Sequence, residues 1–185
     1  MPKTYIVIHH SATPDGVIYR DYDAIKRGHL ARGYRDIGYQ YVVEYINGKL
    51  AVTKGRAEWD TGAHCIPRNK DSIGICIVGN FQGTVPTEEL YQFVATLCKD
   101  IMTRHPIKEI GGHNQYDATA CPGQYFNVEK VRQLTKGQEP TANDALDWLC
   151  QEGVIANPEY WKNAVGCVKY LDALLIGTMK KFKGV

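Results

Sequence analysis

The chain has 185 residues, of which 44% are hydrophobic and 23% are charged, and its formal net charge is +2. This composition is ordinary for a folded globular protein and excludes a disordered chain. The net charge is too small to indicate nucleic-acid binding, although a local basic surface could still favour an anionic cell wall.

Cysteine usage and the first residues bear on where the chain is made. The six cysteines are scattered through a chain too long to need a disulfide scaffold, so synthesis in a reducing compartment is expected. The sequence begins Met1-Pro2-Lys3-Thr4 and has no long apolar stretch. We therefore expect neither a secretory signal nor insertion into a membrane.

Hydrophobic spacing predicts strands and helices mixed along the chain. The expected elements are, in order, a strand at 5–8, a helix at 21–33, a β-hairpin at 39–45 and 50–53, a strand at 72–78, a helix at 87–101, a short strand at 107–110 and a helix at 128–134. Asn47-Gly48 is the strongest short signal of a hairpin turn, and Thr87 is a helix-capping residue. The pattern predicts an α/β fold with a mixed central β-sheet flanked by helices.

A break near residue 137 divides the chain. The run 136–140 combines polar and turn-forming residues and indicates a linker. Helical patterns follow it, but so short a segment makes a marginal core by itself. We therefore expect one domain at 1–137 and a small C-terminal helical unit at 138–185.

Three residues that bind soft metals stand far apart in the sequence: His9, His113 and Cys121. His9 ends an apolar strand, whereas the other two lie in a turn-rich stretch, 111–123, that we expect to fold back on itself. Three protein ligands with a fourth position left to water are typical of a catalytic zinc. A hydrogen-bonded strand-end histidine and an ordinary buried thiol are the alternative. Because side chains alternate along a strand, only one of His9 and His10 can enter a common site, and alternation alone does not say which.

Several short motifs occur in the order seen in one known family. They are Ile8–Thr13, Asp36–Tyr39, Gly62–His64, Ser72–Ile75, Val78–Phe81, Gly112-His113 and Cys121–Gly123. On these motifs, roughly residues 3 to 135 resemble the zinc-dependent N-acetylmuramoyl-L-alanine amidases of the type-2 amidase and peptidoglycan recognition protein superfamily. That superfamily includes small phage lysozymes that are amidases.

The resemblance implies roles for five residues. It places the zinc ligands at His9, His113 and Cys121, with Zn²⁺ as the cofactor. Tyr39, which follows Ile-Gly, is implied to position the zinc-bound water. Thr119 stands where catalytic members carry Lys or Thr, and it would add a neutral donor where Lys would add charge.

Three polar residues in one loop are candidate substrate contacts. The resemblance implies that His64 contacts substrate in the cleft. Arg68 and Asn69 could bind glycan or a peptide carboxylate, because Arg makes bidentate contacts to such groups. Ordinary solvated loop positions are the alternative for all three.

The implied function is hydrolysis of the amide bond between N-acetylmuramic acid and L-alanine by zinc-activated water. The alternative is a non-catalytic peptidoglycan-binding protein of the same fold; such proteins typically lack the metal cysteine, which is present here as Cys121. An enzyme of this kind without a signal resembles a phage or prophage endolysin, made in the bacterial cytoplasm and released to act on the wall. The unit at 138–185 would then bind the cell wall; a brace on the catalytic domain or a homodimer contact are the alternatives.

Overall fold

A computed structural model describes residues 1–13 and 21–137, and in the C-terminal part Ala142, Leu146, Leu149, Cys150, 153–155, Trp161 and 174–179. The chain forms two compact units, Met1–Thr135 and Lys136–Val185. The boundary between them falls at the start of the expected linker. Among the described residues, no helix has the length and apolar character needed to cross a membrane.

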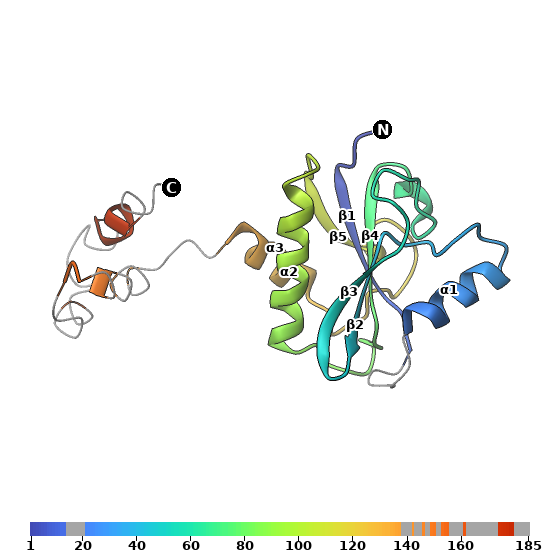
Figure 1. Ribbon diagram of the computed structural model, residues 1–185, viewed down its shortest axis with the longest axis horizontal. Coiled ribbons are helices and arrows are strands. Elements are labelled where there is room, and N and C mark those ends of the chain that lie inside the picture. Colours follow the sequence, from blue (N-terminus) through green and yellow to red (C-terminus); the bar gives the residue numbers. More distant parts are fainter. Residues whose placement is uncertain are drawn as a thin grey trace. The chain divides into compact units, whose positions relative to one another are not determined.

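The first unit is built on a five-stranded mixed sheet with the order β3-β2-β4-β1-β5 (Figure 1). β1 (Tyr5–His10) lies between β4 (Ser72–Ile77) and β5 (Glu109–Gly112) and runs parallel to both. β2 (Tyr41–Ile46) is parallel to β4 and forms an antiparallel hairpin with β3 (Lys49–Lys54). The predicted mixed sheet is confirmed.

Helices cover both faces of this sheet. α2 (Glu88–Met102) and α3 (Val128–Lys136) pack on the face that carries Ile8, whereas α1 (Asp21–Ala31) packs on the face that carries Cys76. Figure 1 shows α1 on the opposite side of the sheet from the other two helices. The predicted α/β class with flanking helices is therefore confirmed.

Local signals explain several element ends. Asn47 and Gly48 both have positive φ, at 52° and 74°, as the predicted tight hairpin turn requires. The Thr87 side chain accepts a hydrogen bond from the Leu90 amide at 3.2 Å, which confirms it as the α2 cap. α1 ends at Ala31, before the predicted residue 33, because Gly33 turns the chain with a φ of 82°.

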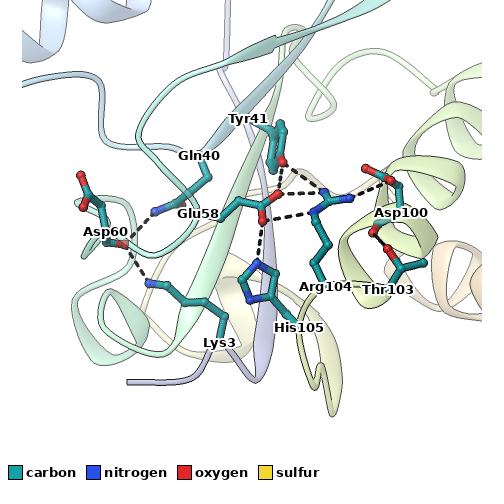
Figure 2. Close-up of polar contacts among 9 residues, drawn as sticks. All are labelled: Lys3, Gln40, Tyr41, Glu58, Asp60, Asp100, Thr103, Arg104 and His105. Atoms are coloured by element: carbon teal, nitrogen blue, oxygen red, sulfur yellow. Dashed lines mark hydrogen bonds and ion pairs between the residues drawn. The ribbon is translucent and has the colours of Figure 1, made fainter.

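A partly buried carboxylate fixes the loop that leads toward His64 (Figure 2). Glu58 Oε2 lies 2.6 Å from His105 Nε2, and Glu58 Oε1 accepts from Arg104 at 2.8 Å and from the Tyr41 hydroxyl. Burial by itself would raise the pKa of the Glu58 carboxyl, but these hydrogen bonds outweigh it and lower the pKa to about 2. The ionised Glu58 carboxylate thus holds this loop to the end of α2.

This network predicts a pH-dependent stability. The folded-state pKa of Glu58 lies below its ordinary value of 4.5, so the stabilisation is complete above pH 4.5 and is lost as the pH falls toward 2. Glu58→Gln should lower the free energy of unfolding by roughly 2–3 kcal/mol at pH 7 and by less than half of that at about pH 3. Urea unfolding followed by circular dichroism measures both, with the exposed Glu89→Gln as the control. A difference that does not change with pH would show that packing, not charge, sets the effect.

The described residues of the second unit form a small apolar core. Ala142, Leu146, Leu149, Leu175 and Met179 are buried together. Residues 174–179 are helical. The expected linker residues 138–140 and most of the segments expected to be helical or to make a homodimer contact lie outside the described residues.

Candidate metal centre

The three predicted metal ligands lie together at one end of the parallel strands. His9 is the penultimate residue of β1, His113 opens the short helix η2 (His113–Gln115) directly after β5, and Cys121 lies in the loop that follows. Their ligand atoms all lie within 4.8 Å of one another. Parallel strands end at the same edge of a sheet, so His9 can share a site with His113, which lies 104 positions further along the chain.

The structure distinguishes the two neighbouring histidines. His9 Nδ1 lies 3.7 Å from the Cys121 sulfur. His10 points to the other face, where its Nδ1 accepts a hydrogen bond from the Phe81 amide at 3.1 Å. His10 contacts the site through its backbone, whose N–H donates to the Cys121 sulfur at 3.4 Å and whose carbonyl oxygen lies 4.0 Å from that sulfur. The implied choice of His9 over His10 agrees with this geometry.

The loop that carries Cys121 is folded back on itself, as expected. The Asn114 amide donates to the Cys121 carbonyl oxygen at 2.8 Å. The Thr119 hydroxyl accepts from the Cys121 amide at 3.2 Å, so this side chain holds the backbone at the cysteine. Thr119 therefore lies near the metal centre, because it holds the backbone of the proposed ligand Cys121.

Burial sets the protonation of the three side chains. It lowers the pKa of His9 well below the usual value, with neighbouring imidazoles adding to the effect. Burial also lowers the pKa of His113, against the attraction of Asp117. Neutral imidazoles are the form that binds a metal. Burial raises the pKa of the Cys121 thiol to about 11, partly offset by the hydrogen bond from the His10 amide.

The donor set fits zinc. Two imidazoles and one thiol are ligand types that zinc prefers, and structural sites usually close with a fourth protein ligand. His113 Nε2 is buried and has no hydrogen-bond partner among the described residues; the nearest acidic oxygen, Asp117 Oδ2, is 3.7 Å away. A buried unpaired nitrogen indicates a partner other than these side chains.

Tyr39 stands beside the metal ligands. Its ring centroid is 5.1 Å from that of His9, and the neighbouring Cys76 thiol adds to the rise of its pKa. Burial raises the pKa of Tyr39 well above 10, so the phenol stays protonated and can donate. The turn before it is tightly held, because the Gly38 amide donates to His29 Nδ1 at 2.8 Å and a Cβ at Gly38 would lie 2.3 Å from the Ala63 carbonyl oxygen.

A cleft of about 440 Å³ lies along α1 next to this centre, lined by neighbours of the three ligands and not by the ligands themselves. Tyr39 and His64 line it, with His29 and Arg32 of α1 and its C-terminal turn. The contributions of His29 and Cys76 escaped the sequence analysis. Cys76 is placed by its pairing with His9 across β4 and β1, which no local pattern encodes.

The three candidate substrate contacts have internal partners. His64 Nδ1 lies 3.0 Å from His9 Nε2, so His64 adjoins the metal ligands. The Asn69 side-chain oxygen accepts from the amides of His64 and Cys65 at 2.8 and 2.9 Å. Arg68 pairs with Asp71 at 3.1 Å and its guanidinium lies 4.0 Å from the centroid of the Tyr5 ring. Substrate binding by His64, Arg68 and Asn69 stays a prediction.

Comparison with known proteins identifies the family. A family model described as N-acetylmuramoyl-L-alanine amidase matches residues 1–124. The chain belongs to this Amidase_2 family. This chain is 32% identical over 136 residues to a peptidoglycan-recognition protein of Drosophila simulans, and the match covers 68% of this chain and 71% of that protein.

Solved structures agree on the fold. The N-acetylmuramoyl-L-alanine amidase LysC of Clostridium intestinale superposes with a TM-score of 0.63 at 24% identity, covering 73% of this chain and 86% of that one. The Drosophila peptidoglycan recognition protein SD superposes with a TM-score of 0.62 at 26% identity, covering 71% and 80% of the two chains. Proteins with this fold thus include an amidase and a recognition protein, so the fold alone does not decide between cutting and binding.

Proposed function

We propose that this chain is a zinc-dependent N-acetylmuramoyl-L-alanine amidase that hydrolyses the bond between N-acetylmuramic acid and L-alanine in bacterial peptidoglycan. The observation that carries the proposal is the group formed by His9, His113 and Cys121, whose ligand atoms lie within 4.8 Å beside a cleft. Three ligands leave a coordination position for water or substrate, as in catalytic zinc sites.

A zinc ion held by these residues would supply an activated water as the nucleophile and would polarise the scissile carbonyl. His9 and His113 offer neutral imidazoles, and Cys121 gives up its thiol proton when it binds a metal. Tyr39, protonated and next to His9, can donate a hydrogen bond to the carbonyl oxygen as negative charge develops on it. Thr119 holds the cysteine backbone and has a hydroxyl proton left to donate.

The second candidate function is peptidoglycan recognition without cleavage. It is favoured by the names of the curated relatives, which are recognition proteins. The presence of the thiol ligand and of Tyr39 beside the cleft supports cleavage instead. Chemical analysis of digested cell wall separates the two. An amidase releases new L-alanine amino termini and no new reducing sugar ends, and the purified protein should contain about one zinc per chain. A binding protein would release neither.

A phage or prophage endolysin, made in the bacterial cytoplasm and acting on the wall after release, is the biological setting that we propose. In that setting the unit Lys136–Val185 would bind the wall and raise the local concentration of the catalytic unit at its substrate.

Removal of this unit tests the wall-binding role. Residues 1–137 should still cleave soluble muropeptide, because every proposed ligand and catalytic residue lies within them, but should lose binding to intact walls. Chromatography of muropeptide digests and a wall pull-down measure the two properties, and circular dichroism checks folding. Unchanged wall binding, or a truncated protein that does not fold, would show that the unit is a brace or a dimer contact and not a targeting module.

A further inference from the structure

The nitrogen of His9 that faces away from Cys121 has a defined partner. His9 Nδ1 lies toward the Cys121 sulfur at 3.7 Å, and His9 Nε2 lies 3.0 Å from His64 Nδ1. The two rings are nearly perpendicular, with an interplanar angle of 82° and centroids 5.0 Å apart. We propose that His64 is a positioning residue, which accepts the His9 Nε2–H and so holds Nδ1 of that ring toward the metal. This inference rests on the proposed zinc site.

The hydrogen-bond geometry assigns both tautomers. A neutral His9 that binds a metal through Nδ1 carries its proton on Nε2. His64 Nδ1 must then be the acceptor, which places the His64 proton on Nε2. That nitrogen lies 3.5 Å from the Ser72 hydroxyl, at the limit of hydrogen bonding, and Ser72 donates to the Arg68 carbonyl oxygen at 2.5 Å. Each donor in this series of hydrogen bonds has an acceptor, and the last acceptor is the backbone carbonyl oxygen of Arg68.

The His64 ring fits in its place because two residues that contact it are glycines. A Cβ added at Gly62 would lie 2.5 Å from the ring, and one added at Gly74 would lie 2.6 Å from it. Gly74 belongs to β4, where it pairs with Val7, so the backbone beneath the His64 ring cannot easily move. Asn69 fixes the backbone of His64, because its side-chain oxygen accepts a hydrogen bond from the His64 amide at 2.8 Å. His64 is thus held by its ring and its backbone independently of any metal.

Such a partner has a measurable effect on a metal site. The second nitrogen of a ligating histidine usually donates to a carboxylate, a carbonyl or water, and loss of that partner typically weakens metal binding 10–100-fold. A neutral imidazole orients His9 in the same way without adding negative charge beside the metal position. Asn69, a candidate substrate contact from its sequence position, acts in this scheme by holding His64.

Two substitutions of similar size separate positioning from packing. In His64→Asn the side-chain oxygen stands near the place of Nδ1 and can still accept from His9, whereas His64→Leu offers no acceptor. Competition with a chromogenic chelator on the full chain should show zinc affinity reduced about 10–100-fold in His64→Leu and largely restored in His64→Asn. His105→Gln, which alters a buried histidine in the Glu58 network, is the control: it should lower thermal stability but leave zinc affinity unchanged.

Ring nitrogen NMR of the zinc-loaded wild type tests the tautomers directly. His64 should show an unprotonated Nδ1 and a protonated Nε2, with coupling across the His9–His64 hydrogen bond. A protonated His64 Nδ1, or equal zinc affinity in wild type and His64→Leu, would overturn the positioning role while leaving the zinc site intact. A wild-type protein that binds no zinc would instead overturn the proposed function itself. The NMR arm also decides the matter if the Leu variant fails to fold.

Discussion

Cys121→Ser is expected to lose zinc and amidase activity together. The Cys121 sulfur lies in the group of ligand atoms within 4.8 Å, and a serine oxygen is a poor ligand for zinc at neutral pH because its proton is hard to remove. Two imidazoles alone leave the site short of its single anionic ligand. We expect zinc content to fall from about one per chain to near zero, and release of L-alanine amino termini to fall to background.

The control for this experiment is Cys98→Ala. Cys98 is buried in α2 on the opposite face of the sheet, so the substitution removes a thiol and some packing without touching the metal ligands. Its zinc content and activity should match the wild type after correction for folded fraction. Wall digestion by a zinc-free Cys121→Ser protein would exclude the proposed mechanism, because the cleavage would then need no metal at this position.

The main elements were predictable because their signals are local. The turn at Asn47-Gly48, the cap at Thr87 and the apolar run before His9 each depend on a few neighbouring residues. The choice between His9 and His10 was different, and it depended on the family resemblance. β1 is buried on both faces, so its hydrophobic pattern does not show which face meets the site. Only the packing of Ile8 against the α2 side reveals that His9 faces α1.

The partners of loop side chains could not be read from the sequence. His64, Arg68 and Asn69 have the residue types of substrate contacts, and their spacing says nothing about internal hydrogen bonds. Their partners include His9 and Tyr5, more than fifty positions away, and these contacts form only when the loop packs against β1. The Glu58 network has the same origin, because it joins a loop to residues just after α2 that lie 46 and 47 positions further along the chain. Such long-range polar contacts follow from the fold and not from any local pattern.

Tyr39→Phe should lower turnover by about 10²-fold while zinc stays bound, as expected for loss of one donor to a developing oxyanion. The Tyr39 ring packs 5.1 Å from His9 and lines the cleft, so Phe can keep the packing and remove only the hydroxyl. Because burial raises the pKa of Tyr39 well above 10, the phenol remains a donor throughout the neutral range. Its own ionisation should therefore not limit activity below about pH 10.

Tyr39 also has the Cys76 thiol as an internal neighbour, so Tyr39→Phe alters an internal contact as well as the proposed donor. Cys76→Ala separates them, because it removes the internal partner and keeps the donor. If the hydroxyl acts on the substrate, Cys76→Ala should reduce kcat far less than Tyr39→Phe, and neither variant should lose zinc. Steady-state kinetics on a soluble muropeptide, with zinc content measured on the same samples, gives both values. Equal losses of kcat in the two variants would mean that the Tyr39 hydroxyl acts through its structural contact with Cys76 and not on the substrate. Unchanged turnover in Tyr39→Phe would remove Tyr39 from the reaction.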